Sequence, residues 1–329
     1  MKIGMMGAGS IGCYVGGALA HAGEDVVFVG RAALGEELGL HGLHLVGLDG
    51  VFRHVGHPAW ATTADVLSDC PVVFVAVKGV AVDEVGAELA TFLRPDAVVI
   101  ALQNGVSAAA TLRQHLGPRA VWSCSVSFNV LRRGEGHFLR GTGGPLSVQH
   151  EFPTDLGKRL QRAGFEVARK DDIRAVLWGK LLLNLNNAIN ALADVPLLEE
   201  FQDRGLRRVF AAAIDEGRQV LKAEGIVPTA FIPVPLWVLV TVLRLPTWLF
   251  LRVARRIVAV DPEARSSMWE DLQRGRSTEV HLLNGEIVAL GERHAIPTPV
   301  NRGIVDAIEV AEQGASVAHR VAELVALAR

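Results

Sequence analysis

The topology of this chain follows from the run Lys2-Ile3-Gly4-Met5-Met6-Gly7-Ala8-Gly9-Ser10-Ile11-Gly12. A short apolar run leads into a G-x-G-x-x-G loop, the loop opens a helical pattern, and a second apolar run follows at residues 25–29. In such a unit the first glycine permits the tight turn, the second admits a pyrophosphate, and the third lets helix and strand pack closely. The N–H groups and dipole of the helix attract the phosphates. We therefore predict a dinucleotide site made by Gly7, Ala8, Gly9, Ser10, Ile11 and Gly12.

The residues after the second apolar run distinguish the two nicotinamide cofactors. An NAD enzyme usually carries an acid here for the ribose 2′-hydroxyl, whereas an arginine accommodates the 2′-phosphate of NADP. This chain has Gly30-Arg31 and no acid until Glu36. Because a guanidinium can bind a phosphate bidentately, the pattern favours NADP(H) bound in part by Arg31. The alternative is that Arg31 is an ordinary solvated arginine.

Composition limits the classes of protein to consider. The 329 residues are 50% hydrophobic with a mean hydropathy of +0.30, which is typical of one large or two ordinary globular domains. Lys and Arg number 33 against 35 Asp and Glu, without a basic run, so no nucleic-acid partner is expected. The three cysteines lack metal-ligand spacing, so we predict no metal site and a reduced compartment. The first residues do not resemble a signal peptide, and we expect a cytoplasmic location.

The first half of the chain alternates apolar runs with helical patterns. The runs are short, as expected of parallel strands buried on both faces, and lie at residues 2–6, 25–29, 72–77, 97–101 and 120–123. Helical patterns at 82–93 and 107–116 separate them, which is doubly wound α/β order. Glycine-punctuated pieces between 131 and 149 predict antiparallel hairpins that complete the sheet.

Only helical patterns remain from about Asp171 onward. They cover residues 173–192, 206–223, 262–294 and 301–328. The sequence thus predicts an α/β protein with two domains. Residues 1–170 form a Rossmann-like, doubly wound domain that binds NADP, and residues 171–329 form an all-helical domain for substrate binding and dimerisation.

The segment 232–260 is apolar enough to be weighed as a membrane helix. A membrane span needs about twenty uninterrupted apolar residues, whereas Arg244 and Pro246 fall in the middle of this segment and Arg252, Arg255 and Arg256 follow. We therefore predict no integral membrane span and favour a buried or interface-forming helical hairpin. If its apolar side chains are exposed, a homodimer contact through the helical domain is the favoured use. Peripheral membrane contact stays open.

Two polar residues follow predicted strands of the first domain. Lys78 comes directly after the run 72–77, and Asn104 follows the run 97–101 within Gln103-Asn104-Gly105. Ligands of open α/β sheets bind beyond the carboxyl ends of strands, so both side chains are expected in the cofactor cleft. The alternatives are a solvated lysine and an ordinary Asn-Gly turn.

The strongest polar signal lies on an apolar helical run. Residues 178–190 read Trp-Gly-Lys-Leu-Leu-Leu-Asn-Leu-Asn-Asn-Ala-Ile-Asn, with one lysine and four asparagines. Lys180, Asn184 and Asn187 have the spacing i, i+4, i+7 and share one face of a helix. Burying these groups unpaired is costly, so the face is predicted to line a cleft, where a lysine of reduced basicity can donate a proton. A polar stripe that bonds to the other domain is the alternative.

A further polar stretch, residues 266–279, holds Ser267 and Glu279. Residues twelve apart on a straight helix lie about 120° apart around its axis, so the two need a broad cleft or a bend at Gly275. Spacing alone does not select them over Asp271 or Thr278.

Together these pieces resemble the ketopantoate reductase (2-dehydropantoate 2-reductase) family over nearly the whole chain. The matching motifs are the glycine loop, Ala76-Val77-Lys78, Leu102-Gln103-Asn104-Gly105, Trp178-x-Lys180-Leu181-x-x-Asn184, Ser267-Met268, Arg276-x-Thr278-Glu279, Gly285 and Ile296-x-Thr298-Pro299. The resemblance implies NADPH-dependent reduction of a small 2-keto acid, 2-dehydropantoate, to pantoate on the route to pantothenate and coenzyme A.

The resemblance also implies a role for each residue. Lys180 is the general acid that protonates the carbonyl oxygen as hydride arrives from the nicotinamide. Asn104 and Lys78 lie at the nicotinamide end of the cofactor, and Glu279 supports both cofactor and lysine. Asn184 and Ser267 hold the hydroxyl and carboxylate groups of the substrate. The predicted catalytic set is therefore Lys180, Glu279 and Asn104, and the predicted substrate-binding set is Lys180, Asn184, Asn187 and Ser267.

The chain departs from the family pattern at one position. The family often has a second asparagine eight residues after the lysine, where this chain has Ala188, with Asn187 and Asn190 nearby. One alternative is therefore an NADP-dependent reductase of another branched 2-keto or 3-hydroxy acid, which a wide pocket lined by Ala188 would favour. Another is a non-catalytic NADPH-binding protein on the same fold, since fold does not fix function. The retained Lys180, Asn104 and Glu279 argue against the non-catalytic alternative.

Overall fold

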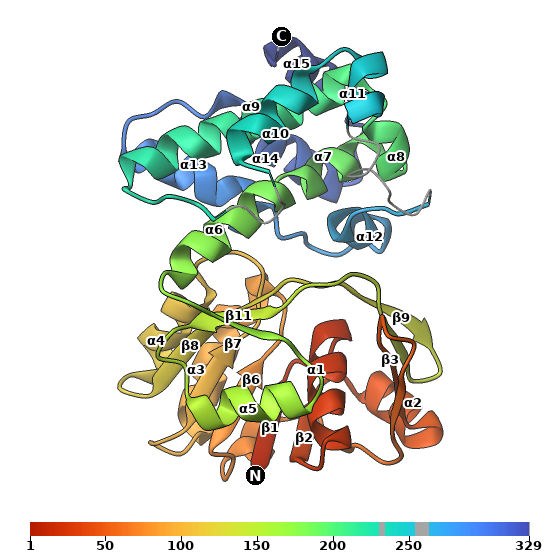
Figure 1. Cartoon of the computed structure of the whole chain (residues 1–329), viewed down its shortest axis with the longest axis vertical. Coiled ribbons are helices and arrows are strands. Elements are labelled where there is room, and N and C mark those ends of the chain that lie inside the picture. Colours follow the sequence, from red (N-terminus) through yellow and green to blue (C-terminus); the bar gives the residue numbers. More distant parts are fainter. Residues whose placement is uncertain (230–233, 254–262, 329) are drawn as a thin grey trace. The chain divides into compact units, whose positions relative to one another are not determined.

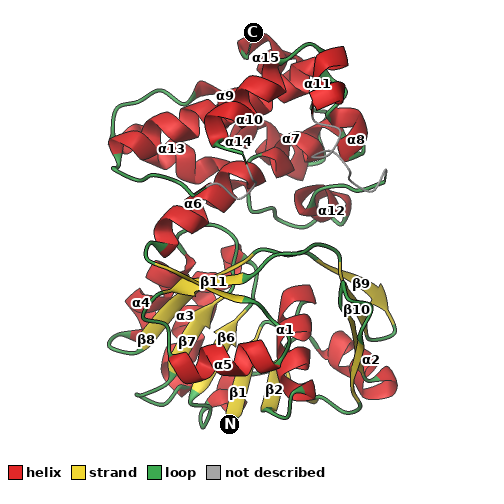
Figure 2. Cartoon of the chain, in the orientation of Figure 1, coloured by secondary structure: helices red, strands yellow, loops and turns green. Residues whose placement is uncertain are grey.

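The computed structural model describes residues 1–229, 234–253 and 263–328. The chain divides into two compact units, Met1–Ile173 and Arg174–Arg329, here called unit 1 and unit 2 (Figure 1). Unit 1 combines strands and helices, whereas unit 2 is built from helices (Figure 2).

An eight-stranded sheet forms the centre of unit 1. Its strands, in spatial order, are β12 (Val167–Lys170), β11 (Leu146–Gln149), β8 (Ala120–Val126), β7 (Val98–Ala101), β6 (Val72–Val75), β1 (Lys2–Met6), β2 (Asp25–Val29) and β5 (Ala59–Ala61). All neighbours from β8 to β5 pair in parallel, whereas β11 pairs antiparallel with β8. The five predicted strands are therefore confirmed, with different bounds at β6, β7 and β8.

The strand order of this sheet reverses at β1. The chain runs outward from β1 through β2 to β5, then returns to β6 on the other side of β1 and continues to β8. In open α/β sheets ligands bind beyond the carboxyl ends of the strands at such a switch point. The loops after β1 and β6 meet there, because Ala76 N donates to Met6 O at 2.7 Å.

Hydrophobic residues cover both faces of the sheet, because successive strand residues point in opposite directions. Val72 and Phe74 of β6 belong to one cluster with α1 (Ser10–His21) and α5 (Thr154–Arg162). Val73 and Val75 belong to another cluster with α3 (Val82–Phe92) and α4 (Ala108–Leu116), which confirms these two predicted helices. The other helices of unit 1 are α2 (Ala32–His41), η1 (Ala64–Leu67) and η2 (Gly79–Ala81).

A second, four-stranded sheet lies apart from the first. Its order is β4 (Phe52–Val55), β3 (Leu43–Val46), β10 (His137–Arg140) and β9 (Val130–Gly134). The prediction that residues 131–149 complete the main sheet is therefore wrong for β9 and β10, and only β11 joins that sheet. The physical reason is a competing partner, because β10 pairs in parallel with β3, a strand that the sequence did not reveal.

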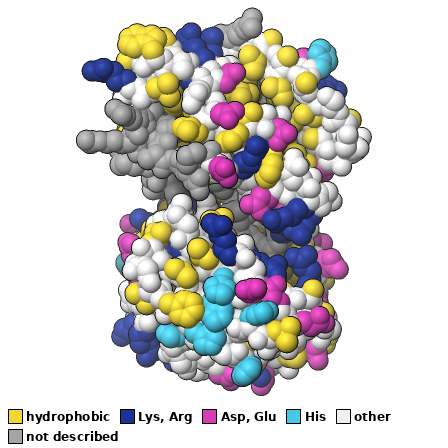
Figure 3. Space-filling model, turned by 90° about the vertical axis from the view of Figure 1, so that its right-hand side faces the viewer, with side chains coloured by type: hydrophobic (Ala, Val, Ile, Leu, Met, Phe, Trp, Pro, Cys, Tyr) yellow, Lys and Arg dark blue, Asp and Glu magenta, His cyan; other side chains and the backbone are white. Residues whose placement is uncertain are grey.

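The two faces of the four-stranded sheet differ in chemistry. Leu43 and Phe138 are fully buried in the cluster that contains α1. On the other face, His54, His44 and His137 stand in one row across β4, β3 and β10, with neighbouring ring centroids 4.5 Å apart. Figure 3 shows histidine side chains gathered on one face of the molecule. Burial lowers the pKa of His44, the hydrogen bond to His41 O opposes this, and the neighbouring His137 and His54 lower the pKa further, so the His44 imidazole favours its neutral form.

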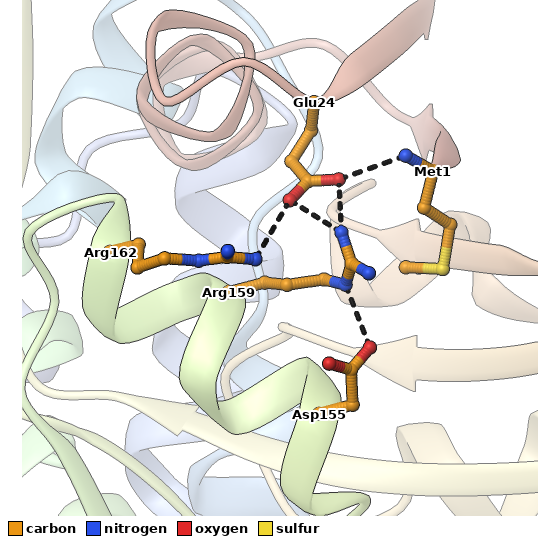
Figure 4. A network of polar contacts seen from close by, with 5 residues as sticks. All are labelled: Met1, Glu24, Asp155, Arg159 and Arg162. Atoms are coloured by element: carbon orange, nitrogen blue, oxygen red, sulfur yellow. Dashed lines mark hydrogen bonds and ion pairs between the residues drawn. The ribbon is translucent and has the colours of Figure 1, made fainter.

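A network of charges joins α5 to the turn between α1 and β2 (Figure 4). The side chain of Glu24 is only 6% exposed and accepts from Arg159 Nη1 at 2.7 Å and from the Met1 ammonium at 3.1 Å. Arg159 also donates to Asp155 at 2.8 Å, and Arg162 lies 3.5 Å from Glu24. Burial alone would raise the pKa of Glu24, but the hydrogen bonds from Arg159 and the ammonium outweigh it and the pKa is lowered. The ionised carboxylate thus holds α5 to the start of β2.

Unit 2 is formed by helices, and no strand follows β12 in the part of the chain that the structure describes. They are α6 (Ile173–Asn184, which begins at the last residue of unit 1), α7 (Asn186–Ala193), α8 (Leu197–Glu200), α9 (Arg204–Ala223), α10 (Leu236–Arg244), α11 (Thr247–Val253), α12 (Ser267–Gln273), η3 (Val280–Leu282), α13 (Asn284–Arg293), α14 (Pro299–Glu312) and α15 (Ala318–Leu327). The predicted helix 206–223 is confirmed as α9.

The other three predicted helices are wrong in length. The helix 173–192 is divided at Leu185, although that residue keeps helical dihedrals of −56° and −26°. The helix 262–294 is three helices, α12, η3 and α13, and the helix 301–328 is two, α14 and α15. Gly275 and Gly314 follow the ends of α12 and α14 with φ of +59° and +76°, and a right-handed helix cannot continue through such a conformation.

The apolar segment 232–260 contains α10 and α11, while residues 232–233 and 254–260 lie outside the described residues, as do Arg255 and Arg256. Pro246 separates the two helices, and Arg244 at the end of α10 pairs with Asp215 of α9 at 2.7 Å. Trp237 and Trp248 are 60% and 71% exposed, so of the two predicted alternatives burial does not hold for these side chains, and the interface-forming hairpin stays a prediction. None of the helices described here is long and apolar enough to cross a membrane.

Candidate functional site

The loop after β1 contains three glycines with different surroundings. Gly7 has a φ of +90°, and a Cβ at this position would clash with the backbone N of Val77. A Cβ at Gly12 would clash with the carbonyl oxygen of Gly7. At Gly9, no atom of another part of the described chain lies within 4 Å of the position that a Cβ would take. The fold therefore requires Gly7 and Gly12, whereas Gly9 leaves an open approach to the backbone.

The open approach at Gly9 leads to the N-terminus of α1. No side chain caps this helix, and its first turn carries no acid. The first intrahelical bond runs from Cys13 N to Gly9 O at 2.8 Å. The N–H groups of Ser10, Ile11 and Gly12 precede it and have no acceptor within the helix. Together with the helix dipole they suit an anion such as a pyrophosphate, so the loop fits a dinucleotide.

The ends of β2 and β6 lie beside this loop. Gly7 N and Ala8 N both donate to Val29 O at 3.0 Å, which brings the end of β2 to the glycine loop. Arg31 follows two residues later, at the start of α2, with an exposed side chain. Lys78 stands at the start of η2, also exposed, two residues after the Ala76 bond to β1. Arg31 and Lys78 thus lie at the same edge of the main sheet as the glycine loop, whereas Glu279, also predicted to support the cofactor, belongs to unit 2.

Asn104 is placed at the same edge by its neighbour Gln103. The buried Gln103 side chain donates from Nε2 to Val75 O at 3.0 Å, and Leu102 N donates to the same oxygen at 2.9 Å. Asn104 follows half-buried in a bend, before Gly105 with a φ of +85°. The Gln103 bond to β6 fixes Asn104 beyond the carboxyl ends of β6 and β7. Sequence reasoning quoted Gln103 only as part of a motif and gave it no role.

The polar face predicted in unit 2 begins on α6. Lys180 and Asn184 lie on α6 and Asn187 on α7, and all three are half-buried among buried leucines. Gly179, beside Lys180, is the point where the backbone of Thr229 crosses the helix, and a Cβ there would clash with Thr229 O. Ala188 has no exposed surface, so it lines no wide pocket.

Ser266 joins α12 to α7. Its hydroxyl caps α12 by accepting from Trp269 N at 3.1 Å and donates to Asn187 O at 2.8 Å. Its backbone N donates to Asn190 Oδ1 at 2.8 Å. Ser267, the first residue of α12, has an exposed side chain. These bonds fix Ser267 relative to Asn187, so two of the predicted substrate residues lie in one bonded assembly.

Asn190 is held in turn by a buried acid. Its Nδ2 donates to Glu200 Oε2 at 2.7 Å, and Glu200 on α8 is 1% exposed. Burial raises the pKa of Glu200 to about 7, although hydrogen bonds from Asn190 and Asn186 oppose the rise. Sequence reasoning missed Glu200, because Glu199-Glu200 is typical of a solvated acidic pair. It also gave no role to Ser266 and Asn190.

Glu279 belongs to a different element from Ser267. It is half-buried at the start of η3, so the two residues do not share one bent helix. Thr278 N donates to Glu312 Oε1 at 2.7 Å, which ties this turn to α14. Within the described residues, no group of three or more His, Cys, Asp and Glu side chains is arranged to hold a metal ion.

Comparison with known proteins places both units in one family. The family model described as ketopantoate reductase PanE/ApbA matches residues 3–150, and the model of its C-terminal part matches residues 172–312. The 2-dehydropantoate 2-reductase of Archaeoglobus fulgidus is 31% identical over 322 residues, which are 95% of this chain and 98% of that protein.

Solved structures share the fold of the whole chain. The crystal structure of a PanE/ApbA family ketopantoate reductase from Ralstonia eutropha has a TM-score of 0.83 and 28% identity, with 95% of this chain and 99% of that chain covered. A ternary structure of D-mandelate dehydrogenase with NADH and anilino(oxo)acetate has a TM-score of 0.77 at 19% identity, over 95% of this chain and 99% of that one, which shows a common fold. Because the family models span both units and a relative above 30% identity covers nearly the whole chain, the chain belongs to the ketopantoate reductase family of oxidoreductases.

Proposed function

We propose that this chain reduces 2-dehydropantoate to pantoate with NADPH, a step on the route to pantothenate and coenzyme A. The observation that carries the proposal is the half-buried Lys180, with Asn184 one turn further along α6, in a member of this family. A half-buried ammonium on a helix face that also carries asparagines can donate a proton to a substrate oxygen and stabilise the negative charge that develops there.

Unit 1 supplies the groups that would hold NADPH. The backbone around Gly9 and the first turn of α1 suit the pyrophosphate, and the exposed Arg31 suits the 2′-phosphate, because its guanidinium can bind a phosphate bidentately. Lys78 and Asn104 would lie toward the nicotinamide end, by resemblance to the family. Bound NADPH supplies the hydride for the reduction.

Unit 2 supplies the groups that would act on the keto acid. The Lys180 ammonium would give a proton to the carbonyl oxygen and stabilise the negative charge that develops on it. Asn184 and Ser267 would donate hydrogen bonds to the hydroxyl and carboxylate groups of the substrate, and Glu279 would orient the ammonium. These roles follow the family resemblance, and the half-burial of Lys180, Asn184 and Glu279 is compatible with contact to a small molecule.

The substitution at Ala188 does not favour a larger substrate. An Ala188-lined pocket was the sequence feature that pointed to another branched acid, and the Ala188 side chain has no exposed surface. The helix is interrupted at Leu185, and the neighbouring Asn187 side chain is half-buried, whereas Ala188 is fully buried. We propose that Asn187 takes the place of the family's second asparagine.

The substrate is tested by following NADPH oxidation with purified protein. We expect the highest kcat/KM for 2-dehydropantoate among a panel of branched 2-keto acids. A clear preference for another acid of the panel would assign the alternative substrate. Tight NADPH binding without turnover of any of them would leave the non-catalytic alternative.

The cofactor is tested by comparing NADPH with NADH. We expect tighter binding of NADPH, and Arg31→Ala should narrow the difference by about 1–3 kcal/mol, the scale of charged hydrogen bonds. Arg133→Ala, which removes an exposed arginine from β9, serves as the control and should leave the difference unchanged. Equal affinity of the unmodified protein for both cofactors would contradict the proposal.

A further inference from the structure

Unit 1 contains a cavity that the proposed reaction does not use. Its volume is about 210 Å³, against roughly 10–15 Å³ needed for one water molecule. The lining includes Tyr14 of α1, Asp49 and Arg53 beside and within β4, Arg140 of β10, and Phe165 before β12. The glycine loop and the predicted cofactor side chains take no part in the lining, so this cavity is separate from the dinucleotide site.

Tyr14 supplies the first polar group of the cavity. The residue is only 4% exposed, and its ring packs edge-on against Phe128 and Phe165, with centroids 5.9 and 6.2 Å away. These contacts fix the ring, and no hydrogen bond to its hydroxyl occurs within the described residues. Burial raises the pKa of Tyr14, whereas Arg53 and Arg140 lower it, so both guanidinium groups act on a hydroxyl that stays protonated near neutral pH.

Arg140 supplies a guanidinium that is held in place. It lies 4.2 Å from the ring centroid of Phe128, and its Nε and Nη2 donate to the carbonyl oxygens of Thr142 at 3.1 Å and Gly144 at 2.5 Å. These three contacts orient the group and leave Nη1 without a hydrogen bond among the described residues. A fixed guanidinium with an unused N–H is suited to an anion.

Arg53 supplies the second guanidinium, with weaker attachments. Its Nη2 donates to Asp49 Oδ2 at 3.3 Å and its Nη1 to Val51 O at 3.4 Å, both long for charged hydrogen bonds. Asp49 is fixed independently, because its Oδ1 accepts from Val51 N at 3.0 Å. Arg53 can therefore turn toward a ligand at little cost.

The charges of the cavity select the class of ligand. Two guanidinium groups and one carboxylate line the cavity, so their charges sum to one net positive charge, while Ala18, Leu48 and Phe165 line the rest with apolar surface. A ligand with a single negative charge and a compact apolar body complements both features, whereas a dianion would leave a charge facing Asp49. We propose that this cavity binds a small aliphatic monocarboxylate. The proposal does not depend on the reaction proposed above.

A spectroscopic probe for this site is available because Tyr14 is the single tyrosine of the chain. Full-length protein labelled with 3-fluorotyrosine gives one ¹⁹F resonance, and isobutyrate is titrated at constant ionic strength. We expect a saturable shift with isobutyrate, none with the neutral isostere isobutyramide, and at least about tenfold weaker binding of inorganic phosphate. Because the probe reports on the cavity alone, this result and the reductase assay can fail independently.

Two substitutions should change the affinity in opposite directions. Arg53→Gln should weaken isobutyrate binding at least about tenfold, and Asp49→Asn should tighten it, because asparagine keeps the bond to Val51 N and removes the opposing charge. Arg133→Gln, at an exposed position outside the cavity, is the control, and thermal unfolding checks the fold of each variant. A resonance that does not move, equal shifts with isobutyramide, or unchanged affinity in both variants would overturn the proposal.

Discussion

At the scale of single residues, Gly9 is a position where a substitution should weaken NADPH binding without destabilising the fold. Its φ and ψ of −91° and −160° suit alanine, and no other part of the described chain lies within 4 Å of the added methyl group. We predict that Gly9→Ala changes the free energy of unfolding by less than about 1 kcal/mol. NADPH affinity should fall at least about tenfold, because the methyl group occupies the approach of the pyrophosphate. Thermal unfolding and NADPH titration measure the two effects.

Gly12→Ala is the matched control for this prediction. Its methyl group would meet the carbonyl oxygen of Gly7, so the variant should lose about 1–3 kcal/mol of stability, as overpacked sites do. If both alanine variants lose stability equally, the distinction between the two glycines is wrong.

Lys180 is the residue on which the proposed chemistry depends. General acid catalysis contributes roughly 10²–10⁴-fold in rate. We predict that Lys180→Ala keeps the fold and NADPH binding but lowers kcat at least about a hundredfold. The pH profile of kcat should also lose the limb that reports the acid. Steady-state kinetics from about pH 6 to 9 measure both, on either side of the neutral range in which a general acid works best.

Lys222→Ala removes an exposed lysine of α9 and should leave kcat unchanged. A Lys180→Ala variant with near-normal kcat would remove Lys180 from the mechanism, and Lys78 would become the next candidate.

At the scale of elements, the errors in the length of the helices predicted at 262–294 and 301–328 share one cause. Arg276 N donates to Asp271 O at 2.9 Å around Gly275, and Ala315 N donates to Val310 O at 3.3 Å around Gly314. Both are six-residue helix ends closed by a glycine in the left-handed conformation. The apolar period continues across each glycine, so periodicity alone joined separate helices. The end of α9 was predicted correctly because its apolar pattern stops at Ala223, two residues before Gly225, which has a φ of +72°.

The main sheet was predictable where its strands were apolar on both faces. The sequence runs that form β1, β2, β6, β7 and β8 are mostly apolar and mostly buried. Short apolar runs of this kind predict strands that are covered on both faces. The four-stranded sheet was not, because β3 reads Leu-His-Leu-Val and β4 reads Phe-Arg-His-Val, so each mixes apolar and polar side chains over only four residues. Such short amphipathic pieces cannot be told from loops before their partner β10 is known.

The candidate site was predictable only where its residues belong to a local sequence motif. The glycine loop, Arg31 and Lys180 were identifiable from local sequence. Ser266 and Asn190 are 76 residues apart and meet only through tertiary structure, so no local pattern revealed their bond.

Glu200 makes the stability of the α7–α8–α12 assembly depend on pH. Its pKa is raised from 4.5 to about 7 in the folded protein. Between these values the folded carboxyl keeps a proton that the unfolded chain loses, so its contribution to stability falls as pH rises toward about 7. We predict that Glu200→Gln removes this pH dependence. The variant should be more stable than the unmodified protein at about pH 8 and similar at about pH 4, as urea unfolding can measure.

Glu199→Gln is the control, because Glu199 is the exposed neighbour of Glu200 and should leave the pH dependence intact. A Glu200→Gln variant that is less stable at about pH 8 would show that the ionised carboxylate is the stabilising form.

At the scale of the whole molecule, each unit is a continuous piece of chain. Every strand of the main sheet lies within residues 2–170, and no described part of unit 2 contributes to it. We predict that a fragment of residues 1–173 folds cooperatively and binds NADPH, although more weakly than the full chain. It should not turn over substrate, because Lys180 and Asn184 are absent. Urea unfolding and NADPH titration of the fragment test this.

The same fragment carrying Gly12→Ala is the control and should unfold at a lower urea concentration than the unmodified fragment. Turnover by the unmodified fragment would show that the reaction site is misplaced. Formation of a homodimer through unit 2 stays a prediction.

The continuity of unit 1 has a consequence for the order of events on the ribosome. The last strand of its sheet, β12, ends at Lys170, so all of its strand partners have been synthesised before unit 2 begins. At about 5–20 residues per second, translation of residues 174–329 then takes on the order of ten seconds, far longer than the milliseconds to seconds in which domains of this kind fold. Unit 1 therefore completes its sheet and its glycine loop while the rest of the chain is still being made, and a nascent chain stalled near the end of unit 2 should already retain NADPH.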